Sequence, residues 1–385
     1  MFPQLDPAQA RFVAELIVSI LGVLLLLMLV VWMICRKQKG ESNTLVSSAN
    51  ELITISDFRL AGYEDLNPLT SKEHLERRTT LDQAYQNWKT ERLLQGEDSH
   101  SLFVRSGVEK SGLRYQLAAS TQVQAFAILI SAMMAESDPQ ASAQAEALFA
   151  SLLAHPAYLQ NELSSWKYLP DLPRSPKLDP DPHAEAWVIF TVLMATKRWP
   201  AINRFHYAEI IQERLHALQE YTEALEPEQI ERLPFSGYLV KQLFALDPSM
   251  DWTSLRKSNE LFYAQLGEQT LFGNEADASR LGLSLLQLGL LALVERDAEA
   301  LRAIGNSRSG LVSLVEDYSK DSLIEIKFSR SAMLACAVPV LLTLQDRDLI
   351  DHVWNELVSL QPGKNDGLGA TLRVLGMAFL AKQQI

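Results

Sequence analysis

Two glutamines, Gln122 and Gln124, and a Ser-Thr pair interrupt the otherwise apolar run AASTQVQAFAILISAMM, residues 118–134. Such a run predicts a buried helix, and a buried amide left without a partner costs about 1–3 kcal/mol. The two amides are two residues apart, so they do not share one face of a helix. One possibility is that they hydrogen-bond backbone groups at the start of the helix, since most side-chain hydrogen bonds go to the backbone or to water. The other is that this polar start of the helix faces a cleft.

Other side chains with chemical potential are scattered along the chain. Asp277 is three residues before Arg280, which suits a first-turn acid paired with an arginine as well as a site. His183 has no second ligand at metal spacing, so we expect no metal. The chain has no phosphate loop, dinucleotide fingerprint, serine-hydrolase elbow, zinc-protease motif or paired cysteines, and we expect no cofactor.

Composition describes a large, acidic chain with a substantial core. The 385 residues have a formal net charge of −12 and a hydrophobic fraction of 48%, which is enough for one large domain or two small ones. Nucleic-acid binders need clustered lysine and arginine on one face. No basic stripe of that kind is present, so we expect no nucleic-acid partner.

An uncharged segment near the N-terminus predicts a membrane anchor. Residues 16–35, LIVSILGVLLLLMLVVWMIC, match the roughly 20 residues of a bilayer-spanning helix. We expect a tail over 1–15, the anchor over 16–35 and a juxtamembrane linker over 36–77. The basic residues directly after the anchor favour a cytoplasmic position for the following domain.

From residue 78 to residue 385 the sequence predicts a helical domain. Apolar residues recur at helical spacing over 80–94, 184–199, 203–221, 277–297, 330–344 and 349–360, and we expect ten to twelve helices. Some of these helices are apolar nearly all round, which places them inside a large multi-helix domain. No fixed repeat period supports a solenoid. The long proline-rich segment over 167–183 is typical of a functional loop.

Three stretches, in order, resemble glycoside hydrolase family 8. The first, TQVQAF from Thr121 to Phe126, resembles the family motif Ser-Glu-Gly-Gln-Gly/Ala-Tyr. In that motif the glutamate is the catalytic general acid. The resemblance places Gln122 at the position of the acid, and Gln124 matches the family's glutamine.

The second stretch, residues 164–200, resembles the family's Trp-Lys segment, its loop and an Asp-x-Asp motif. The two aspartate positions fall on His183 and Glu185, although Asp179 and Asp181 would replace them in another loop register. The third stretch ends in Asp277-Ala-Ser-Arg280, which matches the family's Asp-Ala-x-Arg. There the aspartate is commonly the general base.

The resemblance implies an all-α fold, an (α/α)6 toroid, which would follow the one transmembrane helix predicted over residues 16–35. It also implies substrate contacts from several polar and aromatic side chains: Gln124, Phe126, Tyr238, Arg280, Trp166 and Trp187. An inverting glycosidase needs a carboxylic acid and a carboxylate base about 6.5–9.5 Å apart. A glutamine has no titratable proton, so Gln122 indicates lost or impaired hydrolysis.

Three functions stay open on the sequence. The first is an impaired family 8-like protein that binds β-1,4-glucan, a related polysaccharide or a partner protein such as a polysaccharide synthase subunit. It would act as an accessory factor in bacterial cellulose or other exopolysaccharide production. The second is an active endo-β-1,4-glucanase with Asp277 as base and an acid from Glu109 or Glu185. The third is a helical interaction scaffold. The resemblance favours a domain on the periplasmic side of the bacterial plasma membrane, whereas the charges that flank the anchor favour the cytoplasmic side.

Overall fold

The structure, a computed structural model, describes residues 70–96, 100–111, 114–158, 162–170, 177–199, 207–267, 278–319 and 329–381. This part of the chain is mainly helical. Its helices are α2 (Ser71–Arg92), α3 (Thr121–Met133), α4 (Ala141–Leu153), α5 (Pro182–Arg198), α6 (Tyr207–Glu223), α7 (Pro227–Ile230), α8 (Gly237–Leu246), α9 (Thr253–Gly267), α10 (Ala278–Val294), α11 (Ala298–Asn306), α12 (Arg308–Ser319), α13 (Arg330–Leu344), α14 (Arg347–Ser359) and α15 (Gly367–Ala381).

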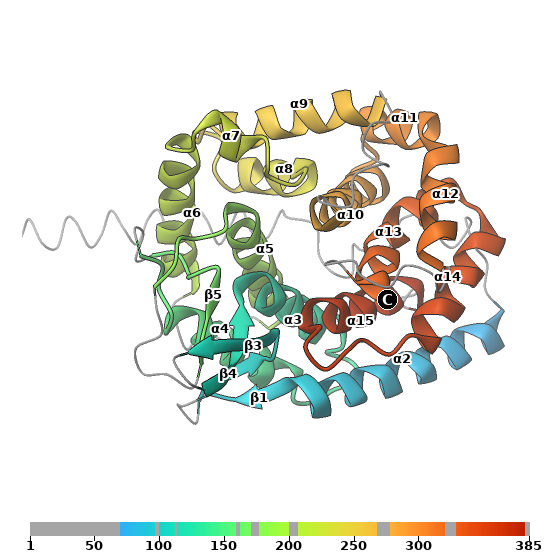
Figure 1. Ribbon diagram of the computed structural model, residues 1–385, viewed down its shortest axis with the longest axis horizontal. Coiled ribbons are helices and arrows are strands. Elements are labelled where there is room, and N and C mark those ends of the chain that lie inside the picture. Colours follow the sequence, from blue (N-terminus) through green and yellow to red (C-terminus); the bar gives the residue numbers. More distant parts are fainter. Residues whose placement is uncertain are drawn as a thin grey trace, which may run out of the picture.

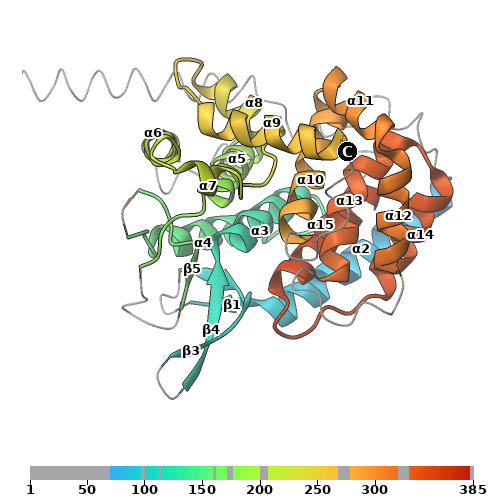
Figure 2. The ribbon, with the colours of Figure 1, turned by 45° about the horizontal axis from the view of Figure 1, so that its top comes forward.

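The helices form two concentric layers around a common axis (Figure 1). In the inner layer, α3, α5, α8, α10, α13 and α15 each contact the next, and α15 contacts α3 again, which closes a ring. The outer layer consists of α2, α4, α6, α9, α11, α12 and α14 (Figure 2). The prediction of an all-helical toroid is therefore confirmed for the described residues.

Hydrophobic patterning explains which helices lie inside. Every residue of α3 is buried, and α13 is buried from Ser331 to Leu342. In the outer α6, burial follows one stripe that contains Ile211, Leu215 and Leu218. Helices that are apolar all round belong inside a domain, and helices with one apolar face belong at its surface.

Short strands accompany the helices at one side of the ring. β1 (Leu93–Gln95) pairs antiparallel with β2 (Leu102–Val104). β3 (Gly107–Ser111), β4 (Arg114–Ser120) and β5 (Lys167–Tyr168) form a second antiparallel sheet, in the order β3-β4-β5. β4 runs directly into α3, so the sheet fixes where α3 begins.

The two ends of the described chain meet and complete the ring. The indole N–H of Trp88 on α2 donates to Thr371 Oγ1 on α15 at 3.1 Å. Arg92, which is 2% exposed, donates to the carbonyls of residues 362–364 before α15. Arg77 on α2 forms an ion pair with Asp351 on α14. The first and last helices therefore support each other.

The first described helix begins earlier than the predicted domain boundary at residue 78. A capping box explains the early start, because Thr70 Oγ1 accepts from Glu73 N while Glu73 Oε2 accepts from Thr70 N. The predicted membrane span, residues 16–35, lies outside the described residues. Within the described residues, none of the helices combines the length and the apolar character that crossing a bilayer requires.

Candidate functional site

The inner helices begin at one end of the ring, which we call the mouth. Neighbouring inner helices meet at matching turns, as Gln122 of α3 does with His183 of α5 and Gly289 of α10 with Val340 of α13, so these helices run in the same direction. Ser106 joins two of these starts, because its hydroxyl accepts from Ser120 N before α3 and its carbonyl accepts from Gly367 N of α15. Helix starts expose N–H groups and favour ligands that accept hydrogen bonds.

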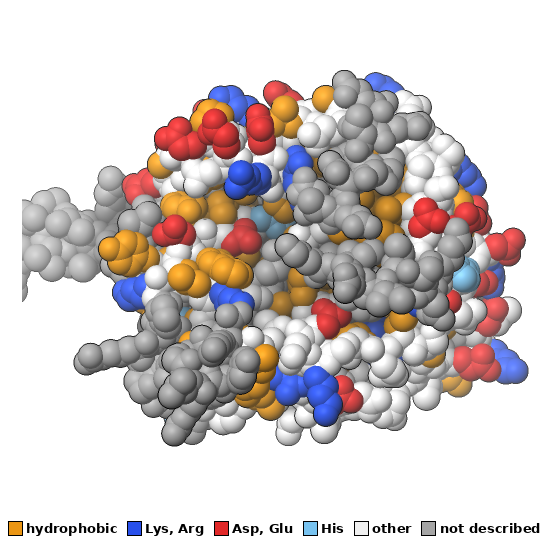
Figure 3. All heavy atoms as spheres, viewed as in Figure 1, with side chains coloured by type: hydrophobic (Ala, Val, Ile, Leu, Met, Phe, Trp, Pro, Cys, Tyr) orange, Lys and Arg blue, Asp and Glu red, His pale blue; other side chains and the backbone are white. Residues whose placement is uncertain are grey.

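Figures 1 and 3 view the mouth. The β3–β4 hairpin lies next to α3 and α4 in Figure 1, and it projects below the ring in Figure 2, where the top of the molecule has come forward. Figure 3 shows hydrophobic side chains in the middle of this face, with a histidine and several charged side chains around them. The mouth therefore combines apolar and hydrogen-bonding surface.

Gln122 and His183 meet at the mouth. Gln122 is in the first turn of α3 and His183 in the first turn of α5, and Gln122 Nε2 lies 3.4 Å from His183 Nδ1. An amide nitrogen only donates, so Nδ1 accepts and the ring proton is on Nε2. Burial lowers the pKa of His183 to about 3. The two positions aligned with a family acid and a family aspartate thus hold a neutral pair.

Asp181 caps α5 beside this pair. Its Oδ1 accepts from the backbone N–H groups of His183 and Ala184, at 2.9 and 3.1 Å. Burial raises the pKa of the Asp181 carboxyl, and the two backbone donors oppose the rise. Asp181 precedes Pro182 at the first helical position, which is a frequent sequence pattern at helix starts.

Glu185 is an internal ion-pair partner. Arg214 Nη1 on α6 donates to Glu185 Oε2 at 2.6 Å, and Ser164 N donates to Oε1 at 2.7 Å. Arg214 Nη2 also donates to Ser164 Oγ. Burial raises the pKa of Glu185, and Arg214 opposes the rise. The hypothesis that Glu185 supplies a relocated acid is corrected here, because both of its oxygens are engaged inside the protein.

Gln124 connects three elements beneath the mouth. Its Oε1 accepts from Val104 N of β2 at 3.0 Å, and its Nε2 donates to Tyr168 Oη of β5 at 2.7 Å. Tyr168 in turn stacks on His155 with ring centroids 4.1 Å apart. Gln124 is fully buried, so its observed role is structural and not the predicted substrate contact. As expected from their spacing, Gln122 and Gln124 point to different neighbours.

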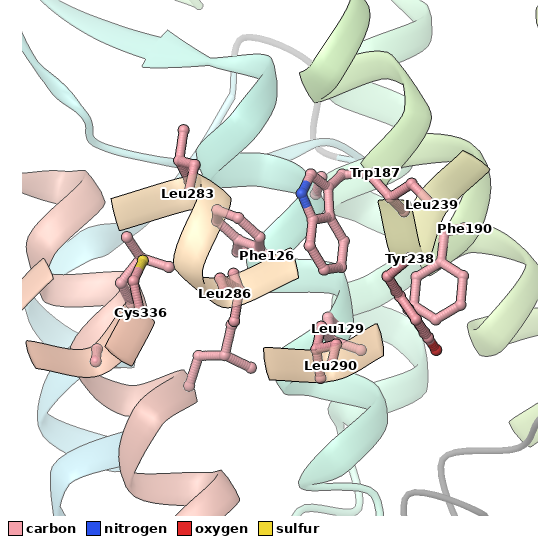
Figure 4. Close-up of a cluster of buried hydrophobic side chains, with 14 of the residues drawn as sticks. Phe126, Leu129, Trp187, Phe190, Tyr238, Leu239, Leu283, Leu286, Leu290 and Cys336 are labelled. Atoms are coloured by element: carbon pink, nitrogen blue, oxygen red, sulfur yellow. The ribbon is translucent and has the colours of Figure 1, made fainter. Parts of the chain in front are cut away.

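Three aromatic residues predicted to contact substrate belong to the core. Phe126, Trp187 and Tyr238 are each fully buried, and Phe126 packs edge-on to Trp187 with centroids 5.1 Å apart. Figure 4 shows them with leucines of α10, including Leu286 and Leu290, in one hydrophobic cluster. Sequence alone could not separate these rings from a sugar-binding groove, because both are rich in aromatics.

Trp166 is the predicted aromatic that reaches the surface. It is 46% exposed, and its carbonyl accepts from Thr121 N at the start of α3. Lys167 Nζ lies 5.4 Å from the centroid of its ring. The backbone of Trp166 therefore lies at the mouth, because it is hydrogen-bonded to Thr121, the residue directly before Gln122.

Arg280, another predicted substrate contact, lies in the first turn of α10. Arg280 Nε donates to the carbonyl of Leu233, in the segment before α8, at 3.1 Å. Asp277, the predicted base, lies outside the described residues. Among the residues described, no three histidine, cysteine, aspartate or glutamate side chains gather into a group that could hold a metal ion.

Sequence reasoning did not single out two residues, Arg214 and Tyr158. Arg214 fixes Glu185, and its signal was an arginine on the apolar stripe of α6, three residues after the buried Ile211. Tyr158 is 67% exposed in the loop before β5. Nothing in its sequence surroundings distinguishes it from a core tyrosine.

Solved structures share this architecture over most of the chain. A β-1,3-1,4-glucanase from Paenibacillus sp. X4 aligns with a TM-score of 0.58 and 14% identity, covering 81% of this chain and 94% of its own. A cold-adapted family 8 xylanase in complex with substrate gives a TM-score of 0.55 and 13% identity over 80% and 91%. A reducing-end xylose-releasing exo-oligoxylanase gives 0.56 and 15% over 80% and 92%.

The chain has the fold of the family 8 glycoside hydrolases. No protein-family model matches the sequence, and no curated protein matches it either. The family 8 fold was thus recognisable from three short motifs in order, while identities of 13–15% leave the residues of the mouth to be judged by their own geometry.

Proposed function

We propose that this protein is a glycoside hydrolase-like protein that binds a β-1,4-linked polysaccharide without efficiently cleaving it. The observation behind the proposal is the neutral pair at the mouth, Gln122 Nε2 with His183 Nδ1 at 3.4 Å. It occupies the positions that the family resemblance assigns to a catalytic acid and an aspartate. An amide group can both donate and accept hydrogen bonds, so Gln122 keeps the chemistry for binding a sugar hydroxyl without that for cleaving its bond.

Chemistry supports binding over hydrolysis. Cleavage of a glycosidic bond by inversion needs a proton for the leaving oxygen and a base for the attacking water. An amide has no proton to transfer, and loss of general acid catalysis costs about 10²–10⁴-fold in rate. His183 does not replace the acid, because its pKa of about 3 leaves it neutral at physiological pH.

The test compares the full-length protein with two variants on soluble carboxymethylcellulose, β-glucan and xylan. We expect the wild type to bind without releasing reducing ends, and Gln122→Glu to release them. Asp277→Ala in the Gln122→Glu background should abolish the gain, if Asp277 is the base. Efficient hydrolysis by the wild type would contradict the proposal, and so would absence of binding to all three polymers.

An active glucanase is the second candidate because of Asp181. This carboxyl lies at the start of α5, and burial raises its pKa, as a general acid requires. Under this alternative, wild-type hydrolysis is abolished by Asp181→Asn and unaffected by Gln122→Leu. Both outcomes differ from those expected for the impaired protein.

We further propose that residues 16–35 anchor the domain in a bacterial plasma membrane, where it assists cellulose or other exopolysaccharide production. The uncharged length of this segment supports the anchor. A phosphatase fused after residue 385 reports the side of the membrane, because the enzyme is active only in the periplasm. A periplasmic domain would meet exported polysaccharide and its synthase. A cytoplasmic one would contradict a role on the exported polymer.

A further inference from the structure

A cavity opens on the outer wall of the ring, between α4 and α6. Both helices belong to the outer layer and contact α5 (Figure 1). The volume of the cavity is about 280 Å³, and one water molecule takes about 30 Å³ of the liquid. The space therefore equals that of about nine waters, which is enough for a small organic molecule.

Much of the cavity wall is aliphatic. Leu152 near the end of α4 and Leu163 in the loop before β5 are fully buried, and Ile210 in the first turn of α6 is partly buried. Apolar walls favour a ligand with a hydrocarbon body, because burial of apolar surface drives binding. They disfavour small inorganic ions, which would lose their hydration without gaining polar partners there.

The charged residues of the same wall leave an excess of negative charge. Glu162 and Glu213 both line the cavity and both are exposed. Arg214 also lines it, but its charge is compensated by Glu185 at 2.6 Å. Two like charges on one cavity repel each other, and a positively charged occupant removes the repulsion. The cavity thus combines an apolar interior with an acidic exposed part.

We propose that this cavity binds an alkylammonium group, a primary amine on a short hydrocarbon chain. The chain packs on Leu152, Leu163 and Ile210, and the ammonium group lies with Glu162 and Glu213 where water reaches them. Lysine side chains pack in this way, with a buried stem and a hydrated charge. The inference is independent of the proposed function, because it involves neither Gln122 nor His183.

The test measures the affinity of pentylammonium for the full-length protein in mild detergent, by ligand-observed NMR, with detergent alone as the blank. 1-Pentanol has the same chain without the charge and should bind more weakly. Glu162→Gln and Glu213→Gln keep the size of each side chain and should each weaken pentylammonium binding about twofold to fivefold. Neither change should affect 1-pentanol. Added salt should weaken binding of the amine only.

Two further variants locate the site. Ile210→Trp fills the cavity with a larger side chain and should abolish binding of both probes, while circular dichroism checks that the fold is kept. Glu220→Gln is the matched control, because Glu220 is an exposed glutamate of α6 about two turns beyond Glu213. We expect no effect of this variant. A loss equal to that in Glu213→Gln would mean that the overall charge attracts the amine, which would overturn the assignment to the cavity.

A second probe, lysine with acetylated N-terminus and amidated C-terminus, distinguishes two sources of the same group. Affinity equal to that of pentylammonium supports a cavity that takes a lysine side chain of a partner protein. Binding of pentylammonium alone supports one that takes a free aliphatic amine. The proposal is overturned if pentylammonium binds no better than 1-pentanol, or if Ile210→Trp binds it like the wild type. These results leave polysaccharide binding at the mouth unaffected.

Discussion

The neutral pair at the mouth is defined by burial as much as by residue type. Gln122 and His183 are 9% and 1% exposed, so solvent has little access to either side chain. The amide of Gln122 is 3.4 Å from Nδ1, and burial keeps the imidazole neutral by lowering its pKa. A histidine on the surface would titrate near pH 6.5. Here the ring cannot accept a proton without breaking its contact with Gln122 or burying a charge.

This burial predicts a pH dependence of stability. The pKa of His183 is about 3 in the folded state and about 6.5 in the unfolded chain. Between these values the unfolded state binds a proton that the folded state does not. The contribution of His183 to stability is therefore complete above about pH 6.5 and falls by up to about 1.4 kcal/mol per pH unit as the pH drops towards 3.

The measurement is urea unfolding between about pH 4.5 and pH 7. His183→Gln removes the titrating ring and keeps hydrogen-bonding groups, so its free energy of unfolding should fall less steeply on acidification than that of the wild type. All other titrating groups are common to both proteins, so the difference in slope reports His183. Equal slopes would mean that the ring is protonated in the folded protein.

Glu185 and Arg214 connect α5 to α6 through an ion pair that excludes solvent. Glu185 is 0% exposed and Arg214 2%. Removing one partner of such a pair leaves an uncompensated buried charge and costs about 3–5 kcal/mol. We expect Glu185→Leu to lower the free energy of unfolding by an amount in this range. The double variant Glu185→Leu with Arg214→Met should be markedly less destabilised. A double variant that is worse than the single one would show that the pair is net stabilising.

Close helix packing in the inner ring depends on glycine. A Cβ added to Gly289 on α10 would lie 2.5 Å from Val340 N and 2.6 Å from Pro339 Cβ on α13. We expect Gly289→Ala to destabilise the protein by about 1–3 kcal/mol through overpacking. Gly305→Ala on α11 is the control, because a Cβ there meets nothing within 4 Å. That change should stabilise by about 0.4–1 kcal/mol, and thermal unfolding of both variants distinguishes the effects.

At the scale of elements, helical periodicity in the sequence was sufficient to predict the helices, but residue type was not sufficient to predict which side chains belong to a site. The apolar runs predicted α5, α10 and α13 close to their observed bounds, because burial on all sides leaves a clear pattern. The start of α2 was placed too late, since the Thr70–Glu73 capping box precedes the apolar periodicity. The buried Glu185 and the exposed Trp166 were both named as site residues. The structure distinguishes them by their partners. Glu185 is bound to Arg214 in an internal ion pair, whereas the carbonyl of Trp166 accepts from the start of α3 and its ring is exposed.

At the scale of the whole molecule, the described helices form a closed ring. A closed ring should depend on its last helix more strongly than an open helical solenoid does. In a solenoid each repeat contacts only its neighbours, so removal of a terminal repeat leaves the rest folded. Here α15 packs against α3 and α13 of the inner ring and against α2 outside it. Trp88 and Arg92, near the start of the described chain, bond to Thr371 and to the carbonyls of residues 362–364.

A chain that ends at Leu360, before α15, should therefore lose cooperative unfolding altogether. Removal of α15 and of the segment before it exposes the apolar faces of α3 and α13. It also leaves the indole N–H of Trp88 and the buried guanidinium of Arg92 without their partners. Circular dichroism during heating should show a broad, weak transition. A chain that ends at Ala381 is the control and should unfold like the full-length protein. If the shorter chain keeps a sharp transition, the ring behaves as an open array of helix pairs. The mouth would then not depend on closure, because the starts of α3 and α5 would stay in place without α15.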